Sequence, residues 1–355
     1  MGIPLTNRIS VRLYSSATYR SRLPVWSRFV KQQGRFQLSY DPGWLAVLES
    51  GLRHEPYILE ASENGEIRGL LPMVLVRSHL FGRYLVGLSY VNYGGIVAEC
   101  SEATGHLVER AVELAKRLDV RTLELRQEVA LEDSRFINVQ DQKVHMRLQL
   151  PDSESKLLKQ IGSKVRNQVR KGENAGLEIV WGGENVLGEF YNVFCRNMRD
   201  LGTPVYSSAL FRSALNQFPD HIEFCVVRLG GNPIAAAMLS HGLGITEVPS
   251  ASSLREYNST CANMLMYWKL LVRAIERHQT IFDFGRSSLD SSTYRFKQQW
   301  GAMPGISVWN YHVRQGDHSR MRPAHPRNQR LIKIWRRLPL PLSRLLGPNI
   351  VRAIP

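Results

Sequence analysis

Hydrophobic and polar positions follow one order along the chain, and they do so twice. Residues 55–76 alternate as strand, turn and strand, with an Asn-Gly pair at the turn. Asn-Gly between two apolar runs is a strong signal for a tight β-hairpin. Residues 222–242 repeat this design with Gly-Gly-Asn at the turn. The pattern therefore predicts two antiparallel hairpins, one in each half of the chain.

The segments around each hairpin also correspond. In the first half we expect helices over 23–34 and 41–52, then the hairpin, a strand over 83–91, a helix over 102–118 and a strand over 122–126; in the second half the counterparts are 185–202, 207–218, 244–252, 261–278 and 280–284. Strands interleaved with helices predict an α/β fold with a mixed, mostly antiparallel sheet in each half. We divide the chain into one unit over 1–150, a second over 151–315 and a tail over 316–355.

A basic helix is expected between the two halves. Its apolar positions fall at helical spacing, and the rest of its surface is cationic: Leu158, Ile161, Val165 and Val169 form the apolar stripe, and Lys156, Lys159, Lys164, Arg166, Arg170 and Lys171 surround it. Two interpretations stay open: a solvated helix face, or a surface that binds an anion.

The tail is basic and partly apolar. Residues 317–355 hold nine Lys and Arg residues against one acid, Asp317, and Leu, Ile and Trp are interspersed among them. Such a stretch can lie on an anionic membrane, with peripheral contact through residues 320–353. The alternative is a tail that packs on the body of the protein.

Composition narrows the classes of protein. The chain of 355 residues is 43% hydrophobic and carries a formal net charge of +15, which fits a folded protein with an anionic partner. Its four cysteines form no CxxC pair, and its ten histidines show no metal-ligand spacing, so we expect neither a metal site nor disulfides. No apolar run reaches the length of a membrane span, and no secretion signal is evident. We expect a cytoplasmic protein that contacts the inner face of the membrane.

Residues 282–302, FDFGRSSLDSSTYRFKQQWGA, contain the letters D-F-G of a protein kinase. A kinase also needs a glycine-rich phosphate loop, a V-A-I-K lysine and an H-R-D loop, and none of these occurs. Asp283 instead ends an apolar strand, where site residues gather in α/β folds. The structural alternative is an ion pair between Asp283 and Arg286, with Tyr294, Phe296 and Trp300 in the core.

Four ordered stretches resemble one family. Residues 70–99, 164–179, 282–302 and 334–348 resemble FemAB-like proteins, in particular a subgroup associated with exosortase/PEP-CTERM and exopolysaccharide systems, and the likeness runs from about residue 8 to 350. The resemblance implies two tandem GNAT-type acyltransferase domains. It implies transfer of an acyl or aminoacyl group, from acyl-coenzyme A or aminoacyl-tRNA, to an amine of a cell-envelope or exopolysaccharide precursor, with no bound cofactor.

The resemblance and the residue types together give candidate site residues. Asp283 is the expected base or amine-orienting group, and Tyr294 the expected proton donor. The other candidates contact substrate: Arg286 and Lys297 for phosphates of a nucleotide- or lipid-linked acceptor, Lys164, Arg166 and Arg170 along the same cleft, and Arg255, Tyr257 and Asn263 beyond the third strand. For Asn263 the alternative is a hydrogen bond at a helix start.

One departure from the GNAT pattern concerns the donor. GNAT enzymes hold the pyrophosphate of coenzyme A on a glycine-rich turn before a helix, but residues 252–265 contain no glycine. This departure argues against coenzyme A, whereas the basic charge suits tRNA. A second function also stays open: a non-catalytic adaptor that kept the fold and lost catalysis. Convergence of Asp283, Arg286, Tyr294 and Lys297 on one pocket would favour the enzyme.

Overall fold

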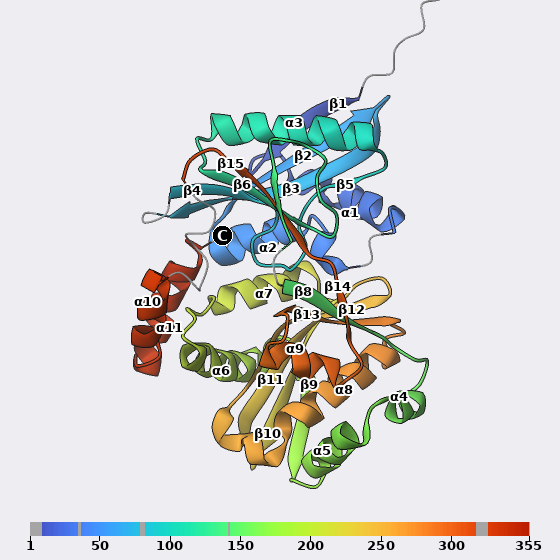
Figure 1. Ribbon diagram of the computed structural model, residues 1–355, viewed down its shortest axis with the longest axis vertical. Coiled ribbons are helices and arrows are strands. Elements are labelled where there is room, and N and C mark those ends of the chain that lie inside the picture. The colour runs from blue at the N-terminus through green and yellow to red at the C-terminus, as the bar shows by residue number, and fades with distance from the viewer. Residues whose placement is uncertain (1–8, 35–36, 79–81, 141–142, 317–325, 355) are drawn as a thin grey trace, which may run out of the picture.

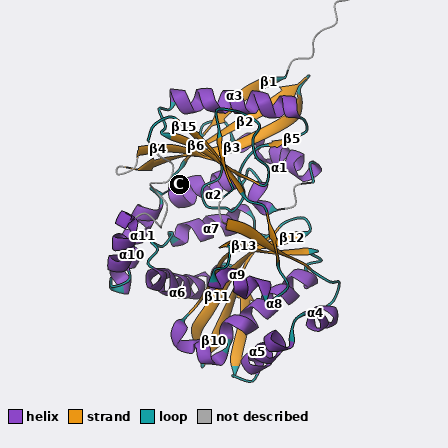
Figure 2. Ribbon diagram, in the orientation of Figure 1, coloured by secondary structure: helices purple, strands orange, loops and turns teal. Residues whose placement is uncertain are grey.

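A computed structural model describes residues 9–34, 37–78, 82–140, 143–316 and 326–354, and it contains two mixed sheets with helices on both faces (Figures 1 and 2). The first sheet runs in the order β1 (Ser10–Ser15), β2 (Glu55–Glu63), β3 (Glu66–Ser78), β4 (Gly82–Val86), β6 (Thr122–Gln127), β15 (Val308–Val313) and β7 (Ile137–Val139), and β5 (Val97–Ala98) pairs with β3. The predicted α/β fold with a mixed sheet in each half is confirmed.

The second sheet repeats the plan of the first. Its order is β14 (Met303–Gly305), β8 (Lys143–Gln149), β13 (Ile281–Ser288), β12 (Ile245–Ser253), β11 (Asn232–His241), β10 (Ile222–Leu229) and β9 (Leu177–Gly182). In each sheet one pair of strands is parallel, β4 with β6 and β12 with β13, and the other pairs are antiparallel.

The two sheets exchange strands across the middle of the chain. β8 precedes residue 150 but pairs with β13 and β14 of the second sheet. β15 comes near the end of the chain but pairs with β6 and β7 of the first sheet. The division at residues 150 and 315 stays a prediction, and each sheet takes one strand from the far side of it.

Both predicted hairpins form with two-residue turns. Asn64 and Gly65 have φ of 52° and 85° between the paired residues Glu63 and Glu66. Positive φ at both central positions defines the type I′ turn, whose twist matches that of the flanking strands. Gly230 and Gly231 have φ of 55° and 79° in the second hairpin.

Eleven α-helices are described: α1 (Leu23–Gln32), α2 (Trp44–Leu52), α3 (Ser101–Arg117), α4 (Glu154–Gln160), α5 (Ser163–Glu173), α6 (Glu184–Leu201), α7 (Ser208–Gln217), α8 (Ala262–Glu276), α9 (Ser292–Gln298), α10 (Pro326–Trp335) and α11 (Leu340–Val351). α3 packs on the outer face of the first sheet, and α5 and α8 pack on the outer face of the second. α1, α2, α6 and α7 contribute to a core shared by both sheets.

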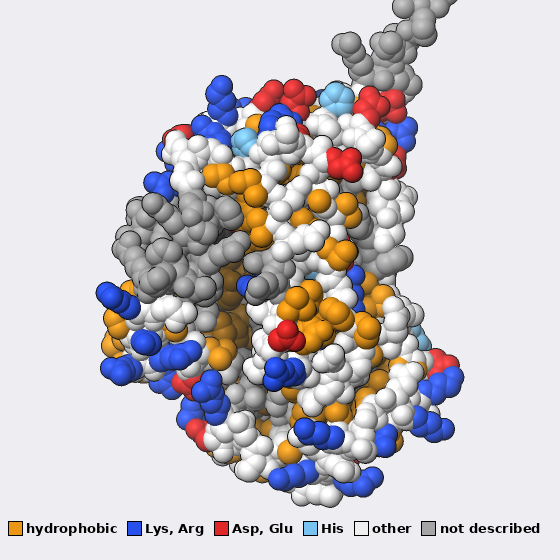
Figure 3. All heavy atoms as spheres, in the orientation of Figure 1, with side chains coloured by type: hydrophobic (Ala, Val, Ile, Leu, Met, Phe, Trp, Pro, Cys, Tyr) orange, Lys and Arg blue, Asp and Glu red, His pale blue; other side chains and the backbone are white. Residues whose placement is uncertain are grey.

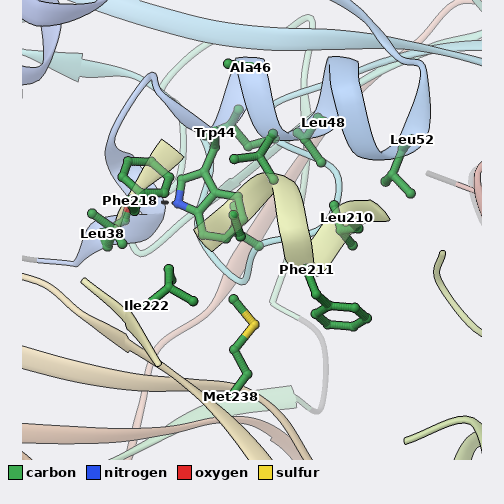
Figure 4. Packing of buried hydrophobic residues seen from close by; sticks show 14 of the residues in the cluster. Leu38, Trp44, Ala46, Leu48, Leu52, Leu210, Phe211, Phe218, Ile222 and Met238 are labelled. Carbon is green, nitrogen blue, oxygen red and sulfur yellow. Dashed lines mark hydrogen bonds between the residues drawn. The ribbon is translucent and has the colours of Figure 1, made fainter. Parts of the chain in front are cut away.

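The contact between α2 and α7 joins the halves inside this shared core. Trp44 of α2 is fully buried against Phe218, and its indole nitrogen donates to the carbonyl of Leu38 at 2.9 Å (Figure 4). The helices approach so closely that a Cβ on Gly51 would lie 2.5 Å from the Cα of Leu210. A glycine is therefore required at this crossing, because backbone cannot give way as a flexible side chain can.

Three predicted segments differ in detail from the structure. The strand expected over 83–91 ends at Val86, because residues 87–94 leave the strand and fold beside β6. The basic helix is broken between α4 and α5, where Ile161 and Gly162 are extended. In the tail, α11 packs against α6, while residues 317–325 lie outside the described residues. None of the described helices has both the length and the apolar character to cross a bilayer.

Candidate active site

The parallel strands β12 and β13 separate soon after they meet. They pair only at Ile245 with Ile281, Thr246 with Phe282 and Glu247 with Asp283. Beyond this point β12 pairs on its other side with β11, and β13 with β8. The strands leave a gap between them that begins at Glu247 and Asp283.

The matching gap in the first sheet is closed by the chain itself. β4 and β6 pair over three residues and then separate, but Gly87 donates to the carbonyl of Glu124 at 2.8 Å, and Gly94 pairs with Arg126. Gly87 and Gly94 touch, since a Cβ on Gly94 would lie 2.0 Å from the Gly87 oxygen. In the second sheet a side chain of this segment reaches the gap, because the hydroxyl of Tyr90 lies 3.3 Å from the hydroxyl of Ser250.

Asp283 is completely buried at the start of the second gap. Its neighbours Phe282 and Phe284 point into the core under α8, so Asp283 points toward the first half. Its Oδ1 accepts from the amide of Gly285 at 2.7 Å, and its Oδ2 accepts from Arg147 Nε at 3.0 Å and from the hydroxyl of Tyr93. Both carboxylate oxygens are therefore engaged.

Tyr93 and Arg147 extend this network to the first half. Arg147 donates to the Tyr93 oxygen at 2.6 Å and pairs with Glu128 at 2.7 Å. Burial, and next the charge of Asp283, raises the pKa of Tyr93 well above its usual value. Tyr93 therefore stays protonated and acts as a hydrogen-bond donor to Asp283.

Glu247 is a second buried carboxyl, placed across from Asp283. It is 2% exposed, and the hydroxyl of Ser39 lies 2.7 Å from each of its oxygens, while the Ser39 amide donates at 3.3 Å. Burial, and next the charge of Asp283, raises the pKa of Glu247 to about 8. Two buried carboxyl groups thus lie side by side, and burial of Glu247 disfavours its charged form.

His145 lies against the same network as a neutral ring. It stacks on Tyr93 with ring centroids 4.2 Å apart. Burial lowers the pKa of His145 to about 3, although the charge of Asp283 opposes the shift. Its Nδ1 is buried and has no hydrogen-bond partner among the described residues. His145 therefore supplies packing and an unused polar atom rather than a charge.

Lys297 holds the backbone of β13 where the strand bulges. The pairing register with β8 shifts between Asp283 and Arg286, and Gly285 has φ of 74°. The Lys297 ammonium donates to the carbonyls of Gly285 and Arg286, each at 3.0 Å. Burial lowers the pKa of Lys297 to about 8. An ammonium has three N–H donors, so one remains for another acceptor.

Arg286 lies beside an indole shared with a second arginine. Arg286 and Arg126 each lie 4.5 Å from the ring centre of Trp309. Arg126 is paired with Glu124 at 2.7 Å. In Arg286, by contrast, Nη1 is buried without a hydrogen-bond partner among the described residues. Burial, and next repulsion from Arg126, lowers the pKa of Arg286 to about 10.

The structure brings together three of the candidate residues, Asp283, Arg286 and Lys297, around the bulge of β13. The predicted alternative of an ion pair between Asp283 and Arg286 is wrong, because Asp283 pairs with Arg147. The core packing expected for Trp300 is found, and Phe296 packs there too. Tyr294 also packs against that core, and its role as proton donor stays a prediction.

The remaining candidates lie elsewhere. Lys164, Arg166 and Arg170 belong to α5 on the outer face of the second sheet, opposite the face that Asp283 uses. Arg170 lines a shallow cavity of about 520 Å³ with Asn167, Lys171, Asn174 and Ala175. Arg255 and Tyr257 lie in a 3-10 helix, Arg255–Thr260, before α8.

Asn263 makes no side-chain hydrogen bond that caps α8, whose N-cap is Cys261. The alternative of a helix-start hydrogen bond is therefore wrong. A role for Asn263, Arg255, Tyr257 and the α5 cations in binding substrate stays a prediction.

Sequence reasoning missed most of the network. His145 and Arg147 alternate with the apolar residues Val144, Met146 and Leu148, and this period of two marks them as the polar face of a strand. Glu247 is the one acid within residues 244–252. Tyr93, Ser39 and Trp309 carry no comparable signal. In the part of the chain that the structure describes, no cluster of three or more His, Cys, Asp or Glu residues is arranged to hold a metal ion.

Comparison with known proteins bears on the fold. Residues 160–298 match the acetyltransferase (GNAT) domain family, and no curated protein matches the chain. FemX has a similar structure, with a TM-score of 0.65 at 14% identity, over 88% of this chain and 98% of FemX. A tandem GNAT protein from the clavulanic acid biosynthesis pathway gives 0.53 at 10% identity, over 87% and 100%. L-PGS from Bacillus licheniformis gives 0.50 at 10% identity, over 79% and 86%.

These likenesses agree with the duplicated architecture seen in the two sheets. Membership of the exosortase/PEP-CTERM subgroup stays a prediction. The chain has a tandem GNAT fold similar to that of FemX, and its residues 160–298 match the acetyltransferase (GNAT) domain family.

Proposed function

We propose that this protein is an N-acyltransferase or aminoacyltransferase that acts on an amine of a cell-envelope or exopolysaccharide precursor. The observation that carries the proposal is the gap between β12 and β13, which opens at two buried carboxyl groups, Asp283 and Glu247. This gap lies within the region matched to the acetyltransferase family. The resemblance of residues 282–302 to FemAB-like proteins is the reason for expecting a cell-envelope acceptor.

The gap suits an extended donor. Beyond Glu247, the edge of β12 that faces β13 pairs with no strand among the described residues. An extended chain with amide groups can pair with such an edge as an added strand does. The reactive carbonyl of an acyl-coenzyme A or an aminoacyl-tRNA then lies near Asp283. The cations of α5 contact the polyanionic part of the donor, away from the reacting group.

The transfer needs a proton acceptor and a positive charge. The amine nitrogen bonds to the donor carbonyl carbon, the ester or thioester bond breaks, and one amine proton passes to the leaving group. Glu247 relays that proton, because a base with a pKa near the working pH is the most effective. The free N–H of Lys297 stabilises the negative oxygen that develops. Asp283 positions Tyr93, Arg147 and the bulge instead of acting as the base.

Arg286 binds an anionic group of the acceptor. Within the described part of the chain its Nη1 has no hydrogen-bond partner, and Arg126 adds positive charge on the same indole. A buried guanidinium without a counter-ion gains strongly from a phosphate or carboxylate. A nucleotide- or lipid-linked precursor carries such groups. The reaction is then located in the cytoplasm, at the inner face of the membrane.

The test is donor binding by calorimetry at low and high salt, with acetyl-coenzyme A, longer acyl-coenzymes A, and charged and uncharged tRNA. The proposal expects one donor class to bind in a salt-resistant manner. It expects Glu247→Gln to keep that binding and to lower the rate of transfer to an amine at least about tenfold. Arg286→Gln should raise KM for an anionic acceptor more than it lowers kcat.

The control is Lys116→Ala, an exposed cation on α3 in the first half, which should change neither donor binding nor transfer. Salt matters because any strongly basic protein binds polyanions weakly. If no donor bound above the salt-sensitive background, the enzyme proposal would be rejected and a binding adaptor would remain.

A further inference from the structure

The two C-terminal helices dock on the body through one side. Ser343, Gly347 and Val351 repeat every four residues on α11 and are buried, and a Cβ on Gly347 would lie 2.8 Å from Val205. Arg344 donates to Asn192 of α6 at 2.8 Å. On α10, Trp335 is buried. This side fixes both helices against α6 and the segment that follows it.

Both helices also expose apolar side chains to solvent. Leu331 and Ile334 of α10 are 57% and 60% exposed, and Leu345 of α11 is 70% exposed. The exposed apolar set of the two helices is Leu331, Ile334, Leu342, Leu345, Leu346 and Ile350. On α11 these residues recur at the spacing of one helical stripe. Large exposed apolar patches on a folded protein mark interaction surfaces.

Cations lie among these apolar residues. Arg330, Lys333 and Arg337 are exposed, and residues 326–354 contain no Asp or Glu. In Figure 3 hydrophobic side chains lie directly beside Lys and Arg side chains over α10 and α11, at the left of the view. We define the C-terminal surface as the exposed apolar set together with these three cations.

We propose that the C-terminal surface docks the protein on an anionic phospholipid membrane. Its leucine and isoleucine side chains enter the boundary between headgroups and acyl chains, and its cations contact lipid phosphates. The combination of apolar and cationic groups on one surface favours an anionic membrane over a protein partner. A protein partner that buried these apolar residues would need acids opposite three cations, whereas an anionic bilayer supplies negative charge at every position along the surface.

The test is flotation of the full-length protein with two kinds of vesicle, phosphatidylcholine alone and phosphatidylcholine mixed with phosphatidylglycerol. The proposal expects binding to the mixed vesicles and little binding to phosphatidylcholine. The double variant Leu331→Gln and Leu345→Gln should weaken binding at least about tenfold, because each leucine loses its contact with lipid. Lys333→Gln with Arg337→Gln should weaken it as well, and more at low salt.

The matched control is Leu158→Gln with Lys159→Gln on α4, an exposed leucine and an exposed cation in another basic region. This control should bind as the unchanged protein does. Equal losses in the control and in the C-terminal variants would mean general charge attraction and would overturn the proposal. The proposal would also be overturned if the protein bound no vesicles and light scattering showed a dimer that the double leucine variant dissociates.

Discussion

Tyr93, from the first half of the chain, donates its hydroxyl hydrogen to Asp283 of the second half, and Arg147 binds both residues. All three groups lie where β12 and β13 separate. The residue that completes the candidate site therefore comes from the same segment, 87–94, that closes the equivalent gap in the first sheet. The two sheets therefore differ in how residues 87–94 meet them: this segment closes the gap in the first sheet and supplies Tyr93 to the second.

Tyr93→Phe tests this link. The change removes a hydrogen bond to a buried carboxylate and an acceptor for Arg147, so we expect unfolding free energy to fall by about 1–3 kcal/mol. Urea unfolding measures it. The matched control is Tyr57→Phe, whose hydroxyl binds Glu55, a carboxylate that stays 39% exposed. Its loss should be under about 1 kcal/mol. Equal losses in both variants would contradict the assigned role of Asp283.

Glu247 makes stability depend on pH. The folded state raises the pKa of Glu247 to about 8, so between its unfolded value and pH 8 the folded protein binds a proton that the unfolded chain releases. The contribution is complete at acid pH and is lost as pH rises through 8. We expect Glu247→Gln to have a flatter profile of unfolding free energy between pH 6.5 and 8. Parallel profiles of the two proteins would show that Glu247 is ionised throughout this range.

His145 gives the opposite dependence. The folded state lowers the pKa of His145 to about 3, so as pH falls below 6.5 the unfolded chain takes up a proton that the folded ring refuses. The free energy of unfolding therefore falls as pH falls below 6.5. His145→Phe keeps a ring against Tyr93, and we expect it to lose less stability between pH 6.5 and 4. Nuclear magnetic resonance should find the His145 ring neutral down to pH 4, and titration of this ring near pH 6 would refute the buried geometry.

Two glycine-to-alanine substitutions, one at the crossing of α2 and α7 and one on α3, should change the free energy of unfolding in opposite directions. Gly51→Ala places a Cβ 2.5 Å from the backbone of Leu210, and we expect a loss of about 1–3 kcal/mol. Gly105→Ala, at an exposed position of α3, meets no atom within 4 Å. It should gain about 0.5–1 kcal/mol, because alanine favours helix. Thermal unfolding of both variants checks the pair. A gain for Gly51→Ala would mean that α2 and α7 separate more easily than their contact indicates.

The sequence carries information about elements, and much less about how elements meet. The hairpins are predictable, because Asn64 and Gly65 accept the left-handed conformation that the turn demands. The repeat of the two units follows from the same local patterns. The exchange of β8 and β15 is not predictable in this way, because the alternation of a strand shows which side is apolar and not which sheet the strand joins.

The same limit applies to the candidate site, where a single residue is predictable and its distant partners are not. Asp283 could be located from its place at the end of an apolar strand, yet its partners come from residues about 190 and 136 positions earlier. Buried polar networks between distant segments leave no local pattern, since a tyrosine such as Tyr93 looks like any other core residue. The pattern of residues 282–302 points to Lys297, but its hydrogen bonds to the carbonyls of Gly285 and Arg286 depend on the folded backbone.

The exchanged strands set the order in which the protein can be completed on the ribosome. The edge of β6 stays unpaired until β15 has been synthesised, and β15 comes after all the strands of the second sheet. Until residues 308–313 leave the ribosomal tunnel, the nascent first sheet has an open edge beside β6, and open edges pair readily with other chains. Neither half is therefore a self-sufficient unit for expression. A fragment ending before β15 should aggregate, whereas a chain that includes β15 closes this edge itself.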